Sequence, residues 1–519
     1  MDISLILFVL MVISLGFLLI RGYPVAFTLA GTALLFAFLG LLIQNISGVP
    51  VGALDFGTIS LLTERIYGIM TNEVLLAVPL FIAMGVMLEK SKVAEDLLET
   101  MAALFGGLRG GLGISITIVG ALLAASTGIV GATVVTMGLL SLPTMLKRGY
   151  DPALAAGSIA AVGTLGQIIP PSIVLVLLGD VLSSSYQVAQ REMGIFSPDT
   201  VTVGDLFAGA FIPGLGLVLL YILYQAGMAW FRPESSPAMP RGADQIIDGK
   251  FILRLFRALV VPIALIVAVL GSILAGIATP TEAASVGAVG AILLGGLKLA
   301  PDKWKRITLS AAGLVGLLIQ AGAGVFPAYA GWLFLALFSW GFAESLISAW
   351  KTGVLREVMT ATLKTSTMIF TILLAAAMFS LVFRAFGGDG YIESFLTGLP
   401  GGVIAAMILV MVVMFILGFF LDFIEIIFVV VPIVAPVLMI MGVDPLWLGV
   451  MIAVNLQTSF LTPPFGFALF YLRGVAPPEI KTSHIYKGVI PFIAIQVLAL
   501  ILLAVFPALA TWLPEVVFG

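Results

Sequence analysis

The chain has 519 residues, of which 61% are hydrophobic and 10% are charged, with no cysteine, one histidine and a formal net charge of −3. A typical soluble domain carries about 25% charged residues, so this composition excludes an ordinary soluble protein and predicts a polytopic helical membrane protein. Without cysteine there are no disulfides, thiol nucleophiles or cysteine-ligated metals, and one histidine argues against a histidine-based metal site or catalytic triad. No basic tract indicates a nucleic-acid partner.

Long apolar segments follow one another along the whole chain. The first, Ile3 to Ile20, has no basic region before it and no small-residue cleavage site after it, so we expect a retained helix rather than a signal peptide. We expect residues 53–70 to form an amphipathic surface segment. Single spans are predicted over residues 3–20, 24–44, 73–89, 152–182, 205–231, 253–276, 281–298, 352–383, 445–472 and 488–513.

Two further apolar stretches, 112–146 and 402–440, are each too long for one span and leave almost no loop between two. Polar residues and glycines interrupt them at 126–131 and 418–425. If both are re-entrant hairpins and the N-terminus is periplasmic, 21 basic residues lie on the cytoplasmic side and three lie outside. Two full spans would give the same count, but the polar breaks favour re-entry. The three outer basic residues are Arg65, Arg191 and Arg384.

Two remaining segments connect these elements. Residues 313–342 lie between two cytoplasmic basic clusters, so they cross the membrane an even number of times or not at all. This leaves two alternatives open, a short hairpin or a helix at the membrane interface. The polar residues 232–250 are predicted to form a cytoplasmic linker.

The sequence contains an internal repeat. The segment "GYDPALAAGSIAAVGTLGQIIPPS" begins at Gly149 and "GVDPLWLGVMIAVNLQTSFLTPPF" begins at Gly442, and each reaches Pro-Pro 21 residues later. The predicted topology gives the two copies opposite orientations. Each half therefore holds a hairpin followed by a proline-broken helix, inverted relative to the other half. This pattern is typical of secondary transporters, whose sites form where the breaks meet, with freed carbonyls for cations and half-helix N-termini for anions.

The hairpin tips and the helix breaks hold most of the unusual polar groups. Sodium binds several hard oxygens, which hydroxyls and freed carbonyls supply. For any single serine or threonine, the alternative is helix packing through small residues. The predicted sodium ligands are Thr127, Gly128, Thr133, Gly163, Thr164, Gly166, Asp422, Asn455, Thr458 and Thr462. The predicted substrate-binding residues are Ser126, Gln167, Pro170, Pro171, Ser172, Glu425, Gln457, Pro463 and Pro464.

Two acidic residues lie at the second hairpin tip. Asp422 and Glu425 are three positions apart in "GFFLDFIE", and acids at such depth in a membrane are costly and usually functional. Each could bind a cation, couple a proton or orient the hairpin; alternatively the tip reaches the outer interface and both acids are hydrated. Glu282 follows Pro280 at a helix start, where the helix dipole alone accounts for an acid.

At these residues the chain resembles the large membrane subunit of the tripartite ATP-independent periplasmic (TRAP) transporters. The resemblance implies a sodium-driven importer of an organic acid in the bacterial inner membrane, with an elevator mechanism and no cofactor other than sodium as the coupling ion. It implies two partners, a separate small four-helix membrane subunit and a periplasmic substrate-binding protein. The matching stretches are "GYPVAFTLAG" (22–31), "VPLFIAMGVMLE" (78–89), "KRGYDPALAAGSIAAVGTLGQIIPPSI" (147–173), "GIATPTEAASVGAVGA" (276–291), "GFFLDFIEIIFVVVPIVAPV" (418–437) and "TPPFGFALFYLRGVAP" (462–477).

The resemblance also implies a division into a scaffold and a transport domain. Transport-domain half 1 is expected at 73–182 (hairpin 112–146, broken helix 152–182) and half 2 at 352–472 (hairpin 402–440, broken helix 445–472). The remaining predicted parts are scaffold helices 1 and 2 with the amphipathic arm at 1–72, a loop and scaffold helix at 183–231, the linker at 232–250, scaffold helices with the insertion at 251–351, and a cytoplasmic loop with the C-terminal scaffold helix at 473–519.

The sequence departs from the family pattern at the first hairpin tip, where Ile129 and Val130 stand at positions that are often serine. The insertion and the linker resemble the mannitol/chloroaromatic branch, which implies a monocarboxylate or 2-oxo acid rather than a C4-dicarboxylate. The alternative function is a stand-alone sodium/carboxylate symporter without a binding protein. A channel would need a continuous polar stripe, and "GGDG" at 387–390 has no second acidic motif to form a membrane protease, so we predict a transporter and not an enzyme.

Overall fold

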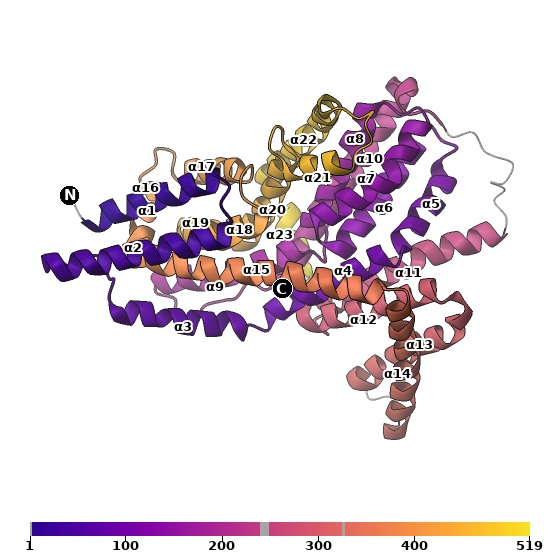
Figure 1. The fold of residues 1–519 in the computed structure, drawn as a ribbon, viewed down its shortest axis with the longest axis horizontal. Coiled ribbons are helices and arrows are strands. Elements are labelled where there is room, and N and C mark those ends of the chain that lie inside the picture. The colour runs from indigo at the N-terminus through magenta and orange to yellow at the C-terminus, as the bar shows by residue number, and fades with distance from the viewer. Residues whose placement is uncertain (1–2, 239–248, 324–326) are drawn as a thin grey trace.

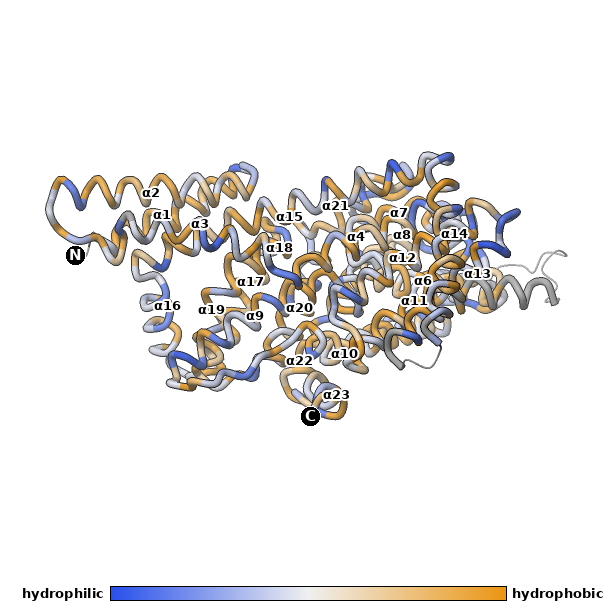
Figure 2. The backbone as a smooth tube through the Cα atoms, turned by 90° about the horizontal axis from the view of Figure 1, so that it is seen from below, coloured by the Kyte–Doolittle hydropathy of each residue, from blue (hydrophilic) through white to orange (hydrophobic). Residues whose placement is uncertain are grey.

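The computed structural model describes residues 3–238, 249–323 and 327–519, so residues 239–248 of the predicted linker at 232–250 lie outside the described part. Within these ranges all regular secondary structure is helical, which confirms the predicted all-α fold. Nine of the described helices are long and apolar enough to cross a membrane, or up to 11 if each bent helix pair is one span. Figure 2 shows hydrophobic residues along most helices and hydrophilic segments mainly at their ends.

The first half of the chain contains the predicted hairpin 112–146 as α6 and α7, and the predicted broken helix as α8 and α9. The predicted end of that helix at residue 182 is wrong, because the helix continues for ten residues through the polar sequence "SSSYQVAQRE", where apolar character ends but helix propensity does not. The elements are α1 (Ile3–Ile20), α2 (Val25–Ser47), α3 (Phe56–Met70), η1 (Val74–Leu76), α4 (Ala77–Lys90), α5 (Val93–Phe105), α6 (Gly111–Thr127), α7 (Val130–Lys147), α8 (Pro152–Thr164), η2 (Leu165–Gln167), α9 (Ile173–Glu192), α10 (Val203–Phe231) and η3 (Pro233–Ser235).

The second half contains the predicted hairpin 402–440 as three helices, because a 54° bend separates α18 from α19. The predicted span 488–513 is wrong at both ends: α22 begins at Thr482 and ends at Val505, just before Phe506, whose position ahead of a proline disfavours helix. The elements are α11 (Gly249–Leu274), α12 (Pro280–Leu299), η4 (Pro301–Lys303), α13 (Trp304–Ala323), α14 (Ala328–Lys351), α15 (Val354–Ala385), α16 (Gly388–Thr397), α17 (Gly402–Leu417), α18 (Phe423–Val429), α19 (Val431–Ile440), α20 (Pro445–Leu461), α21 (Phe467–Val475), α22 (Thr482–Val505) and α23 (Ala508–Phe518).

The repeated G-x-D-P motif starts a helix in the same way in both halves. The glycine adopts a positive φ, 78° at Gly149 and 95° at Gly442, which permits the tight turn. The aspartate then caps the helix: Asp151 accepts a hydrogen bond from the Leu154 N–H, and Asp444 accepts one at the matching position. Proline occupies the first helical position, where no backbone donor is needed. The repeat seen in the sequence is therefore a repeat in structure.

The long helix α15 lies beside α2, α3 and α4, and it also contacts α18 of the second hairpin (Figure 1). α8 packs against α6, α7 and α22, and α10 contacts α6 and α20. The hairpins and broken helices thus form one packed group, and α4 and α15 border it. The assignment of α10 and α22 to a scaffold stays a prediction.

The insertion 313–342 forms parts of two antiparallel helices, α13 and α14, which project from the rest of the molecule in Figure 1. Ser310 Oγ donates to the Phe338 carbonyl at 2.6 Å, and a Cβ on Gly313 would lie 2.8 Å from the Phe334 carbonyl oxygen, so the helices run in opposite directions. Of the two alternatives for this segment, the structure has a helical hairpin.

Candidate functional site between the hairpin tips

The two broken helices cross at their centres. Gln457 Nε2 of α20 donates to Thr164 Oγ1 of α8 at 3.3 Å, and the two residues are 293 positions apart, the same offset that separates the Pro-Pro motifs. Gln496 Nε2 of α22 donates to the same hydroxyl at 3.3 Å and to the Tyr221 hydroxyl of α10 at 2.8 Å. All four side chains are buried. A buried polar cluster therefore holds the crossing at the axis that relates the two halves.

The tip of the first hairpin lies against the first helix break. α6 ends at Thr127, and Gly128 follows with a φ of 61°, which glycine adopts without strain. A Cβ on Gly128 would lie 3.1 Å from the backbone nitrogen of Ile173, where α9 begins. The hydroxyls of Thr127 and Thr133 share a hydrogen bond of 2.8 Å. The structure thus brings the tip and the break together, as a cation site shared between them requires.

Glycines allow this close approach of backbones. A Cβ on Gly85 of α4 would lie only 2.5 Å from Thr127 Cα. A Cβ on Gly163 would lie 2.1 Å from a methyl group of Val134 in α7, and one on Gly166 would lie 3.3 Å from the Ala124 carbonyl oxygen. Gly163 and Gly166 therefore have a role in packing, which does not depend on whether their carbonyls bind an ion.

Ser172 closes the first break. Its hydroxyl donates to the carbonyls of Gly166 at 2.8 Å and Gln167 at 3.1 Å, so it satisfies two of the carbonyls that the helix leaves free. Pro170 and Pro171 are buried, and Ser126 turns its hydroxyl back to the Leu123 carbonyl. Among the described residues Gln167 has no partner for either side-chain atom, although the side chain is fully buried. An unpaired buried amide is costly, so this one is available to a ligand, an ion or water.

The two acids at the second tip form a capping box at the start of α18. Asp422 Oδ1 accepts from the Phe423 N–H at 2.7 Å, and Glu425 Oε2 accepts from the Asp422 N–H at 2.9 Å. Glu425 is only 8% exposed. These hydrogen bonds are those expected of acids that orient the hairpin, one of the predicted roles.

The second break is more open than the first. Asn455 Nδ2 donates to the Met411 carbonyl of the hairpin at 2.9 Å, which ties the break to α17. Thr458 and Thr462 each donate to the carbonyl four residues earlier, at 2.8 and 2.7 Å. Pro463 is half-buried and Pro464 is exposed, and the Pro464 carbonyl accepts from the Tyr486 hydroxyl at 3.1 Å.

A cavity of about 360 Å³ lies between the two hairpin tips and the border helices. The first hairpin, the start of α9, the second tip, α20 and α21 line one side, and α4 and α15 line the other. Of the residues predicted for sodium or substrate, Asp422 alone is among the described residues that line it. The lining residues are Glu89, Ile129, Val130, Gly131, Ala132, Val135, Ile173, Thr365, Met368, Ile369, Asp422, Phe423, Ile424, Phe460 and Tyr471.

The charges and helix dipoles of this cavity favour the binding of an anion together with cations. The described lining includes the carboxylates of Glu89 and Asp422 and no lysine or arginine. The N-terminal ends of two helices, α7 at Val130 and α9 at Ile173, open onto the cavity, and their backbone dipoles attract anions. An organic anion can therefore bind to the helix ends when cations balance the carboxylates.

Several of these residues were not singled out from the sequence. Gln496 and Tyr221 of the crossing lie in apolar runs that were predicted only as spans. Tyr471 and Thr365 of the cavity lie at the end of the second predicted broken helix and in the predicted span 352–383. A single amide in "PFIAIQVLALIL" is costly to place in a membrane, so the sequence indicated that Gln496 has a polar partner inside the protein. The sequence gave no such indication for Thr365, since a single hydroxyl in a helix is common.

Comparisons with known proteins agree with this geometry. Residues 11–509 match the family "Tripartite ATP-independent periplasmic transporter, DctM component". The chain is 28% identical over 457 residues to the C4-dicarboxylate TRAP transporter large permease protein DctM of Vibrio cholerae, covering 86% of each chain. It is 26% identical over 435 residues to the isethionate TRAP transporter permease protein DctMQ of Oleidesulfovibrio alaskensis, covering 84% of this chain and 57% of that protein.

A solved structure shares the fold. The Alcanivorax borkumensis YdaH transporter superposes with a TM-score of 0.57 over 92% of this chain and 98% of that chain, at 14% sequence identity. The family match spans nearly the whole sequence, including both hairpins and both broken helices. The chain belongs to the DctM family, the large permease subunits of TRAP transporters.

Proposed function

We propose that this subunit imports a small organic acid anion together with sodium, and that the anion binds in the cavity between the hairpin tips. The observation that carries the proposal is the convergence of both inverted-repeat hairpins on one cavity. Relatives are named for the transport of C4-dicarboxylate and isethionate, both of them organic acids. The monocarboxylate or 2-oxo acid preference inferred from the sequence is part of the proposal.

Sodium coupling is supported by the charge of the cavity. Asp422 brings negative charge to a space that would receive an anion, and no described lysine or arginine lines it. Glu89 also lines this space, but Lys90 Nζ lies 3.1 Å from its Oε1 and balances part of its charge. A cation bound at the first tip, near Thr127 and Gly128, and another near Asp422 would remove this repulsion. Anion binding would then depend on sodium, and the anion would in turn raise the affinity for sodium, because binding linkage is reciprocal.

The long helix α15 contributes to the wall of the cavity. Thr365, Met368 and Ile369 of this helix form the wall that faces the hairpin tips. We propose that the hairpins and broken helices move as one group against the scaffold helices, with the inverted repeat supplying the inward-open and outward-open states. A periplasmic binding protein would deliver the anion, and a separate small membrane subunit would extend the scaffold. In this arrangement the N-terminus is periplasmic.

Uptake into proteoliposomes tests the function. The purified subunit, reconstituted with the small membrane subunit and the binding protein, is expected to accumulate at least one of radiolabelled pyruvate, lactate or succinate when a sodium gradient points inward. An equal potassium gradient should give background uptake; equal uptake with both gradients would contradict sodium coupling. Leaving out the binding protein separates the alternatives, because a stand-alone symporter would retain full uptake.

A further inference from the structure

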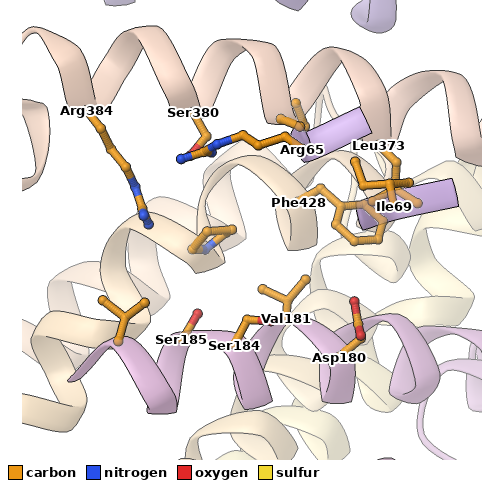
Figure 3. Close-up of a pocket in the computed structure, with 14 residues that line it drawn as sticks. Arg65, Ile69, Asp180, Val181, Ser184, Ser185, Leu373, Ser380, Arg384 and Phe428 are labelled. Carbon is orange, nitrogen blue, oxygen red and sulfur yellow. The ribbon is translucent and has the colours of Figure 1, made fainter. Parts of the chain in front are cut away.

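A second cavity, of about 280 Å³, lies beside the same helix α15 (Figure 3). It is bounded by α3, α9, α15, α18 and α19. Three serines contribute hydroxyls to its wall, and Asp180, Arg65 and Arg384 contribute charges. In Figure 3 both arginine side chains extend into the cavity, whose opposite wall is α9 with Asp180, Ser184 and Ser185.

The second cavity continues the path of the first. α15 lines the first cavity up to Ile369 and the second from Leu373, which is about one helical turn further on. α9 lines the first with Ile173 and the second from Asp180 onward. The α18–α19 segment also contributes to both cavities. The same three segments thus line two chambers in series. The topology proposed above places the second chamber on the periplasmic side, since α9 then runs outward.

The charges leave one arginine without a partner. Arg384 Nε lies 3.1 Å from Asp389 Oδ2, so that carboxylate balances part of its charge. Asp180 on the opposite wall accepts a hydrogen bond from Asn72 Nδ2 at 2.9 Å. Asp389 also attracts the Arg65 guanidinium, but among the described residues no carboxylate lies within ion-pair distance of Arg65, which is partly buried beside Arg384. A small anion between the two guanidinium groups would satisfy both, because arginine forms paired hydrogen bonds with carboxylates.

We propose that this chamber is an outer site for the organic acid, in which Arg65 and Arg384 hold the carboxylate before it reaches the cavity between the hairpin tips. This inference rests on the proposed function and adds a second binding step to it. The carboxylate binds at the arginine wall, away from Asp180. Ser184 and Ser185 lie across the chamber, where they can bond the hydroxyl or carbonyl oxygen of a 2-hydroxy or 2-oxo acid.

Arginine modification tests the site without requiring transport. The wild-type subunit in phosphatidylcholine nanodiscs is treated with phenylglyoxal, and modification of each arginine is followed by peptide mass spectrometry. Lactate or succinate at millimolar concentration should slow the modification of Arg65 and Arg384 at least three-fold. The neutral analogues lactamide and succinamide should not, at equal sodium chloride. Arg191, an exposed arginine on the same side in the proposed topology, is the internal control and should react at an unchanged rate.

Two results would overturn the proposal. The first is equal modification of both arginines with acids and amides. The second is slower modification of both arginines that appears only when the nanodiscs contain phosphatidylglycerol, which would assign the site to a lipid headgroup. Uptake assays then test whether the outer site contributes to transport. R65Q and R384Q should each raise the KM for pyruvate about ten-fold. R65K should raise it less, and R191Q should leave it unchanged. A wild-type subunit that transports none of the acids would contradict the proposed function, while the protection assay would still report on the outer site.

Discussion

The two halves of the molecule repeat the same parts but enclose them differently. In the first half the helix break is buried, with Pro170 and Pro171 covered and the Gly166 and Gln167 carbonyls bonded by Ser172. In the second half Pro464 is exposed, and Phe465 is 44% exposed. We infer that packing and hydrogen bonds hold the first break more tightly than the second, although both breaks belong to the same packed group. Substitutions in the first half should therefore affect stability most, and those in the second half should affect transport.

The largest effect is expected where backbones meet in the first half. Gly85→Ala places a Cβ 2.5 Å from Thr127 Cα, so α4 or the hairpin tip must shift. Overpacking of this kind costs about 1–3 kcal/mol, and we expect a clear fall in Tm and loss of most uptake. The second half provides the control: Gly474→Ala in α21 meets no atom within 4 Å and should change neither measurement. Equal effects of the two substitutions would contradict the inferred difference in packing between the two halves.

The next largest effect is expected from a substitution at the second hairpin tip, and it is an effect on transport. Asp422→Asn removes the charge but keeps an oxygen that can accept from the Phe423 N–H. The Tm should therefore change little, while the sodium concentration for half-maximal uptake should rise about ten-fold or more. Asp444→Asn changes an equivalent helix cap outside the described cavity lining and should leave sodium dependence unchanged. An Asp422→Asn variant with wild-type sodium dependence would show that this acid does not bind the ion.

A matched pair of serines sharpens the contrast in stability. Ser172→Ala leaves the Gly166 and Gln167 carbonyls without the hydroxyl that bonds them, and the cost should be about 1–3 kcal/mol. Ser459 lies in the second broken helix, and its hydroxyl has no partner among the described residues, so Ser459→Ala should cost little. Thermal unfolding in detergent measures both variants. Similar losses would mean that the two breaks are fixed to the same degree.

The smallest effect is expected at the crossing that both halves share. Gln457→Leu and Thr164→Val each remove one side of a 3.3 Å hydrogen bond. Buried hydrogen bonds between membrane helices contribute about 0.6 kcal/mol on average, so the coupling energy from a double-mutant cycle should be near that value. Gln496 also donates to Thr164, so Gln496→Leu should show coupling with Thr164→Val of similar size. A coupling energy near zero would mean that packing alone holds the crossing.

Local patterns in the sequence predicted the helices and hairpins better than they predicted the contacts between them. Glycine, proline and aspartate at fixed spacing located both broken helices, because turns and caps depend on those residue types directly. The length of two apolar stretches and their polar interruptions located both hairpins. Gln496 was missed because the run around it is apolar on all sides, so the pattern does not tell which face points inward. Thr365 was missed because it is one of several polar residues in "TATLKTSTM", and none of them stands out. Likewise the cavity wall on α15 depends on how helices pack, which no single segment specifies.

The contact between Thr164 and Gln457 also bears on how an inverted repeat can change over time. In a two-fold symmetric dimer a position on the axis meets its own copy, so the residue there must complement itself. Here the two copies lie on one polypeptide, and the position holds a hydroxyl in one copy and an amide in the other. Joining the halves in one chain thus frees each copy to diverge, and the centre of the fold pairs a hydroxyl with an amide, two different groups that identical subunits could not supply at one position on the axis.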